Sequence, residues 1–128
     1  MSKKVTSAFT NDSWDEVPND AWAEDTLSRA SITKTFTGEI TGTSKVESIM
    51  LRTPNDGPMV YVAVERFDVK IDGKSGGFVL IHDATMVDGK YDSSWRVLPG
   101  SGSGDLAGIT GTGEITPKHD FFLTYDLG

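Results

Sequence analysis

The sequence predicts an all-β protein, a closed eight-stranded antiparallel meander barrel with little or no helix. From Ala30 onward, runs of about ten residues with alternating apolar and polar side chains end in short clusters of Gly, Pro, Asn or Asp, which is the rhythm of an antiparallel meander. No segment repeats its apolar residues with the period of a substantial helix. A closed barrel is favoured over a two-sheet sandwich because closure removes exposed sheet edges. The length of 128 residues fits a single domain, 1–128.

The first thirty residues are the least regular part of the chain. Residues 5–9 predict a strand, which could extend through Trp14. The acidic stretch 15–25 (Asp15 to Asp25) carries five acids and no base, and it is interpreted as a long surface loop. A short helix over 20–27 is the alternative.

Five strands follow in order, each ending at a turn signal. The predicted strands cover residues 30–40, 44–52, 59–70, 76–83 and 90–98. The turns between them are expected at Thr41-Gly42-Thr43, at the Asn-Asp-Gly within residues 53–58, at Asp72-Gly73 and at Asp88-Gly89. These dipeptides tolerate the positive φ that tight hairpins need.

The glycine-rich stretch 100–115 is too close to the end of the sequence to link a second domain. We interpret it as a loop that runs into a strand with bends or close approaches at its glycines. A phosphate-binding loop is disfavoured, because the stretch lacks a Lys-Ser or Lys-Thr ending and no helix pattern follows. Residues 118–127 predict the last strand.

Charge and composition exclude several classes of function. Twelve Lys and Arg against nineteen Asp and Glu give 12 − 19 = −7, which disfavours nucleic acid and anionic membrane surfaces as partners. The absence of cysteine excludes disulfides, thiolate zinc sites and cysteine nucleophiles. No apolar run reaches about 18 residues and no leader pattern opens the sequence, so the expected location is cytoplasmic.

One charged side chain falls on an apolar strand face. Ile32, Phe36 and Ile40 share one side of their strand, and Lys34 lies on the same side because side chains two apart share a face. A lysine on an apolar face requires a partner.

The strand over 59–70 has two candidate inner faces. Tyr61 and Glu65 lie on one side, and Val60, Val62 and Val64 lie on the other. The alternation alone leaves open which face is inside.

Several motifs, in order along nearly the whole chain, resemble a family of small bacterial proteins. The motifs are SWDE (13–16), RASITKTF (29–36), ERF (65–67), FVLIH (78–82), WRVLPGSG (95–102), LAG (106–108) and YDL (125–127). The family is the one catalogued as domain of unknown function 3224, grouped by fold with the allene oxide cyclases. The resemblance implies the same closed barrel and favours Tyr61 and Glu65 as inward. It carries over no catalytic residue.

Six side chains could then line one cavity. They are Lys34, Tyr61, Glu65, His82, Trp95 and Tyr125. One interpretation is a pocket for a small apolar or aromatic ligand with cyclase- or isomerase-like acid/base chemistry, in which Glu65 or His82 moves a proton. The other is a buried Lys34–Glu65 pair beside a structural histidine. Binding without turnover needs only the cavity, and Trp95 is expected to be buried.

No metal site or cofactor is predicted. His82 and His119 are the two histidines, and they lack the spacing of metal ligands. The acids of the stretch 15–25 lack the regular spacing of a calcium loop.

Three valines form the remaining candidate surface. If Val60, Val62 and Val64 face outward, they make an apolar stripe of the kind that subunit interfaces use. Covering of the stripe by the N-terminal segment, through Trp14 or Trp22, is the alternative. The second functional hypothesis is therefore a noncatalytic structural or interaction module that acts as a homo-oligomer.

Overall fold

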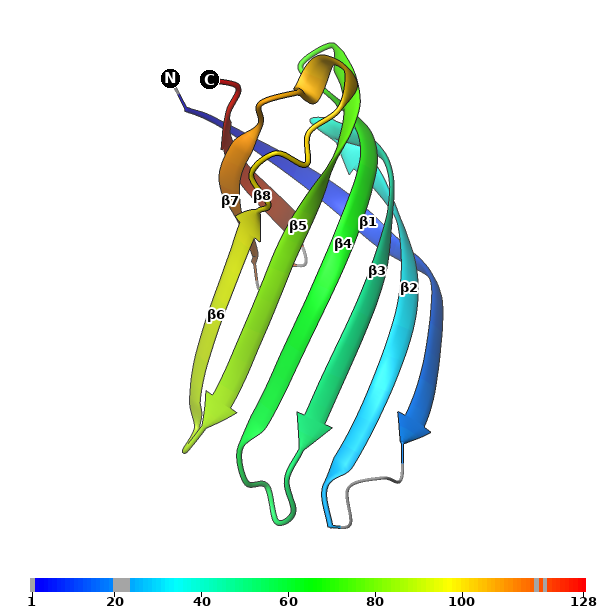
Figure 1. Cartoon of the computed structure of the whole chain (residues 1–128), viewed down its shortest axis with the longest axis vertical. Helices are drawn as coiled ribbons and strands as arrows, with labels where there is room; N and C mark the ends of the chain where they lie inside the picture. Colours follow the sequence, from blue (N-terminus) through cyan, green and yellow to red (C-terminus); the bar gives the residue numbers. More distant parts are fainter. Residues whose placement is uncertain (1, 20–23, 117, 119) are drawn as a thin grey trace.

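The computed structural model describes residues 2–19, 24–116, 118 and 120–128, and it confirms the predicted fold class. Eight antiparallel strands follow one another around a closed barrel in the order of the sequence (Figure 1). They are β1 (Lys3–Asn19), β2 (Thr26–Gly38), β3 (Ile40–Arg52), β4 (Met59–Ile71), β5 (Lys74–Val87), β6 (Lys90–Val97), β7 (Thr110–Ile115) and β8 (Asp120–Asp126). Within the described residues, the one helical segment is a 3₁₀ turn, η1 (Gly104–Leu106).

The barrel is closed at one end and open at the other. β7 and β8 have six and seven residues, whereas β1 to β5 have at least thirteen each. In the described part of the chain, the ladder between β1 and β8 runs only from Lys3 to Ala8, and β6 meets β7 at a single pair, Arg96 with Thr112. The long strands therefore continue past the short ones as a curved sheet with a concave inner face (Figure 1).

The core fills the closed end, where both termini lie (Figure 1). Phe67 stacks on Phe78 with ring centroids 4.5 Å apart, and Leu106 and Ile109 are fully enclosed. Around them pack Val5, Phe36, Ile40, Val69, Ile71, Leu80, Val97, Phe121, Leu123 and Tyr125. The side chains at this end of the barrel thus pack into one hydrophobic core.

The glycine-rich stretch runs into a strand, as predicted, and it seals the closed end against β5. The Ser103 amide donates to the Gly77 carbonyl at 2.9 Å, and the Ser103 hydroxyl accepts from the Gly77 amide at 3.1 Å. A Cβ on Gly76 would lie 2.0 Å from the Ser103 carbonyl oxygen. The absence of a side chain at Gly76 lets the loop come this close, so this glycine serves the packing of the loop against β5.

The prediction of a long loop over the acidic stretch is wrong for its first part. β1 continues to Asn19, so residues 15–19 are strand. Backbone pairing with β2 decides this, although the polar sequence of the segment did not indicate it. The alternative helix over 20–27 is also wrong where it can be judged, because Thr26 and Leu27 belong to β2; residues 20–23 lie outside the described residues.

The turn expected at Thr41-Gly42-Thr43 lies at Glu39 in the structure. β2 ends at Gly38 and β3 begins at Ile40, so Gly42 lies inside β3. Its φ is +132°, and a Cβ there would lie 2.4 Å from the carbonyl oxygen of Asp68 on β4. Gly42 is therefore required for a close approach of two strands, which a sequence signal alone cannot distinguish from a turn.

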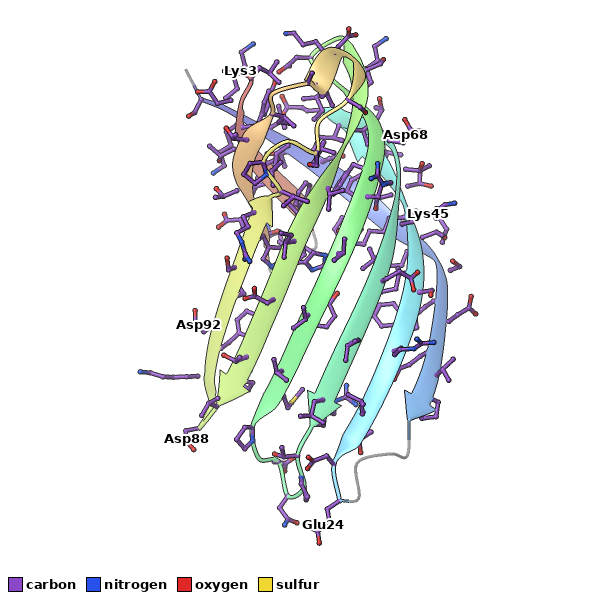
Figure 2. The ribbon with its side chains drawn as sticks, viewed as in Figure 1. Lys3, Glu24, Lys45, Asp68, Asp88 and Asp92 are labelled. Atoms are coloured by element: carbon purple, nitrogen blue, oxygen red, sulfur yellow. The ribbon has the colours of Figure 1, made fainter. Side chains whose placement is uncertain are left out.

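Charged side chains lie on the outside of the barrel. Figure 2 shows Lys45 and Asp68 projecting away from the sheet, and both are exposed.

Among the helical residues that the structure describes, none form a segment long and apolar enough to cross a membrane.

Candidate functional site

Four strands bring polar side chains together inside the barrel wall. Lys34 on β2, Ser44 on β3, Glu65 on β4 and His82 on β5 all face inward and are buried. Lys34 lies directly opposite Ser44 in the ladder, which fixes the two on the same face. We call these four residues the ionic cluster. Tyr61 and Glu65 point inward, so their face of the strand over 59–70 is the inner one, which the alternation alone left open.

Glu65 is the centre of the ionic cluster. Its Oε1 lies 3.4 Å from Lys34 Nζ and 3.2 Å from His82 Nε2, and its Oε2 accepts a hydrogen bond from the Ser44 hydroxyl at 2.5 Å. Despite this short distance, neither ring nitrogen of His82 has a hydrogen-bond partner within the described residues. Lys34 Nζ also lies 4.8 Å from the centre of the Phe9 ring.

The ionic cluster keeps the Glu65 carboxyl ionised. Burial acts to raise the pKa of Glu65, but the contact with His82, the charge of Lys34 and the Ser44 hydroxyl outweigh it, so the pKa lies below its ordinary value. Both carboxylate oxygens are engaged, and the side chain has no exposed surface. Glu65 is thus a buried charge with partners at both oxygens, whereas the ring nitrogens of His82 have no hydrogen-bond partner within the described residues.

Two aromatic rings flank the histidine of the ionic cluster. Trp95 stacks on His82 with ring centres 4.2 Å apart and planes at 17°, and Tyr61 lies at 5.6 Å from the same ring. The expectation that Trp95 is buried needs correction, because Trp95 is only half-buried. In the described chain, β6 pairs with β7 only at Arg96, the residue after Trp95, so Trp95 itself has no ladder partner on that side.

Tyr125 does not join the other five predicted site residues. It is buried in the core at the closed end, where its hydroxyl donates to Asp72 in the turn between β4 and β5. Burial, followed by the neighbouring Asp72 carboxylate, raises the pKa of Tyr125 to about 12. The prediction placed all six side chains along one cavity. For Tyr125, the alternation of the strand gave the correct inward face, but it did not show how far along the barrel axis the residue lies.

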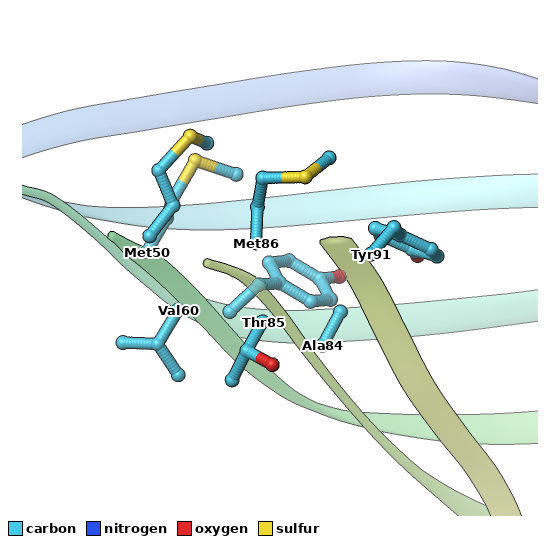
Figure 3. A pocket seen from close by; sticks show the side chains of 8 residues that line it. Met50, Val60, Ala84, Thr85, Met86 and Tyr91 are labelled. Carbon is cyan, nitrogen blue, oxygen red and sulfur yellow. The ribbon is translucent and has the colours of Figure 1, made fainter. Parts of the chain in front are cut away.

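An apolar hollow of about 210 Å³ opens on the concave face at the open end. It is lined by Met50, Met59, Val60, Tyr61, Ala84, Thr85, Met86 and Tyr91. Figure 3 shows Met50 and Met86 pointing to one side of the sheet while Val60 and Thr85 point to the other. Of the six predicted residues, only Tyr61 contributes to this lining.

Tyr61 connects the hollow to the ionic cluster. Burial raises the pKa of its hydroxyl to about 12, assisted by the negative charge of Glu65 and opposed by a hydrogen bond with Ser48. The neutral phenol is therefore the form present at neutral pH. Its ring lines the hollow and also packs near His82.

Sequence reasoning missed most residues of the hollow. Met50, Met59 and Met86 stand on three strands, and nothing in their spacing along the chain predicts that they meet. Ser44 was missed as well, although the position opposite Lys34 would have indicated it once the register was known.

No group of three or more His, Asp or Glu side chains is arranged to hold a metal ion in the described parts of the chain. His119 lies outside those parts.

The outer face of β3 and β4 carries an apolar patch. Ile49, Val62 and Val64 are each about half exposed, at 50%, 49% and 49%, and Val60 is half-buried beside them. Trp14 does not cover this patch: it pairs with Ile32, so it lies on the concave face, where it is 53% exposed. Trp22, the other expected cover, lies outside the described residues.

These features define a small antiparallel β-barrel with a buried ionic cluster and an apolar hollow at its open end. The chain belongs to the DUF3224 family, described as a protein of unknown function, whose model matches residues 5–128. A crystal structure of a DUF3224 protein of unknown function from Shewanella oneidensis MR-1 is similar, with 32% sequence identity and a TM-score of 0.78 over 98% of this chain and 95% of that one. No curated protein matches the chain.

Proposed function

We propose that this barrel binds a small, neutral, apolar or aromatic molecule in the hollow at its open end. The observation that supports the proposal most directly is the hollow itself, which combines thioether, methyl and aromatic surface with the hydroxyls of Tyr61 and Tyr91. Ligand sites are typically apolar concavities with a few polar groups that orient the ligand.

The size of the hollow favours a ligand of one or two fused rings. Its volume of about 210 Å³ is below the ~300–1,000 Å³ of sites that enclose drug-sized molecules. Three of its side chains are methionines, which are flexible and polarizable and adapt to ligands of different shape. A planar ring against Tyr61 and Tyr91 would also gain stacking energy.

The geometry supports binding better than acid/base catalysis. A general base must come within hydrogen-bond reach of the proton that it abstracts. Glu65 is fully enclosed with both oxygens occupied, and the Tyr61 ring packs between the hollow and His82. The ionic cluster is therefore proposed to stiffen the wall behind the ligand.

Methionine methyl groups provide the test. Protein labelled with ¹³C at these methyls gives one signal for each of the four methionines, three of which line the hollow. Titration with indole is expected to shift the signals of Met50, Met59 and Met86 and to leave that of Met1 in place. Ala84→Phe fills the hollow and is expected to abolish these shifts.

Val87→Phe is the matched control for Ala84→Phe. Val87 lies three residues further along β5, on the opposite face of the strand, and is already 43% exposed. The control should bind indole like the wild type. Unmoved methyl signals in the wild type, or equal shifts in Ala84→Phe, would count against a ligand site in the hollow.

A second candidate function, homo-oligomerisation through the outer patch, rests on the exposure of Ile49, Val62 and Val64. The three patch residues line a surface depression of about 260 Å³ that also includes Arg29 and Glu47. In a two-fold dimer, Arg29 of one copy could pair with Glu47 of the other, because such an interface is self-complementary.

Sedimentation equilibrium tests this second candidate. The wild type is expected to show a concentration-dependent dimer, and Val62→Lys with Val64→Lys is expected to yield a monomer with an unchanged circular dichroism spectrum. A wild type that remains monomeric at every concentration would exclude the dimer.

A further inference from the structure

All three internal methionines of the chain converge on one hollow. The sequence holds four methionines, of which one is Met1, and the other three, Met50, Met59 and Met86, line the hollow at the open end. They come from three adjacent strands, β3, β4 and β5. Figure 3 shows Met50 and Met86 projecting from the same side of the sheet.

The strand register brings the three thioethers within reach of one another. Met59 lies directly opposite Met86 in the ladder, where Cβ atoms are about 4.5–5.5 Å apart. Met50 lies opposite Tyr61, which places it diagonally across from Met59 at a distance that long side chains span. Three rotatable bonds in each methionine allow the sulfur atoms to turn toward a common point.

Three neutral sulfur donors at one point are the ligands that a soft metal ion prefers. Thioethers select Cu(I) over the hard cations that carboxylates and carbonyls bind. A single positive charge costs less to desolvate than a double one. The aromatic side chains of Tyr61 and Tyr91 line the same hollow, and aromatic rings attract cations. The net charge of −7 draws cations toward the protein.

We propose that the hollow is a site for one soft monovalent cation, Cu(I), held by the thioether sulfurs of Met50, Met59 and Met86. Met86 is 37% exposed, so the ion can enter from solvent without opening the barrel. No change of oxidation state is involved. The site uses the same hollow as the apolar ligand but does not depend on that function, because it rests on the sulfur atoms and not on the apolar surface.

The experiment uses Ag(I), a redox-inert ion of the same charge and softness, and Cu(I) kept reduced under anaerobic conditions. In ¹³C-methyl methionine protein, one equivalent of either ion is expected to shift the three internal methyl signals together. In the variant Met50→Leu/Met59→Leu/Met86→Leu these ligands are lost, while Met1 and both histidines remain. Competition with a chromogenic chelator is expected to show affinity at least about tenfold lower for the variant.

Leucine keeps the lining of the hollow apolar, so the leucine variants test the Cu(I) site separately from the proposed binding of an apolar ligand. Met-to-Leu exchanges cost little stability, and each single variant should also weaken metal binding if the triple variant folds poorly. The triple variant is expected to retain indole binding, measured by fluorescence. If one equivalent of ion leaves the three methyl signals unmoved, or the folded leucine variants bind it as tightly as the wild type, the metal site is disproved, whatever the result with indole.

Discussion

Glu65 on β4 contacts Lys34, Ser44 and His82, so its negative charge links side chains of three other strands, β2, β3 and β5. Glu65→Gln keeps the shape and removes the charge. Lys34, which is 7% exposed, would then be a buried cation without its partner. We expect a loss of about 3–5 kcal/mol in the free energy of unfolding at pH 7, measured by denaturant titration.

Asp68→Asn is the matched control on the same strand. Asp68 is exposed on the outer face of β4, three residues from Glu65, and the same chemical change there should alter the free energy of unfolding by no more than about 0.5 kcal/mol. Equal effects of the two substitutions would mean that the ionic cluster contributes nothing to stability.

The lowered pKa of Glu65 also sets the pH dependence of stability. The unfolded chain binds a proton at this carboxyl at higher pH than the folded protein does, because its ordinary pKa is 4.5. The contribution of Glu65 is therefore fully present above that value and is lost as the pH falls through the lowered folded pKa. We expect the stability difference between wild type and Glu65→Gln to shrink when the titration is repeated at pH 3.

At the scale of single residues, the sequence predicted the pair Lys34 and Glu65 correctly, and it missed the methionines of the hollow. Alternation within one strand identifies a lysine on an apolar face, and the resemblance supplied the inner face of β4. Met50 and Met86 are related only through the pairing of β3 with β4 and of β4 with β5. Register between strands is a property of the folded sheet, so composition and spacing could not reveal this group.

At the scale of the elements, β5 packs closely against the loop between β6 and β7 at two of its glycines, Gly76 and Gly77. A Cβ at Gly76 would meet the Ser103 carbonyl oxygen at 2.0 Å, which belongs to the backbone and cannot rotate away. Gly76→Ala is expected to lower the free energy of unfolding by about 1–3 kcal/mol in thermal or denaturant unfolding. Ser75→Ala, an exposed position next to it, should have almost no effect.

β1 is the element for which sequence reasoning failed most clearly. Residues 15–19 carry acids and a proline, a composition typical of a loop. In the structure, the 13-residue β2 offers a complete row of backbone partners, and β1 pairs along it as far as Asn19 after a bulge at Asp12. Composition reports only on side chains, whereas residues 15–19 are a strand because their backbone forms hydrogen bonds with β2.

For the whole molecule, the eight-strand meander was predicted because its turn signals and alternation agree with one another and with the family resemblance. The difference in strand lengths was not predicted, and it divides the barrel into a solid closed end and an open end. Segments with few buried contacts open locally at low free energy, whereas core strands exchange only on global unfolding.

We therefore expect a gradient in amide hydrogen exchange along the barrel. Amides at the closed end, around Phe67 and Leu80, should exchange slowly, and those of β6 from Lys90 to Ser94 should exchange orders of magnitude faster. Peptide-level hydrogen–deuterium exchange with mass spectrometry measures this. Uniform protection of β6 and the closed end would indicate that the open end is as rigid as the core.

The open end also leaves parts of two strand edges outside the ladders of the described residues: β1 pairs with β8 only from Lys3 to Ala8, and β6 pairs with β7 only at Arg96. Such edges are templates on which another molecule can add a strand and begin aggregation. Here the bulge at Asp12 distorts one template, Pro18 removes an amide from it, and Lys90 places a charge at the end of the other. These three features oppose edge-to-edge pairing at the end of the barrel where the hollow is open to solvent.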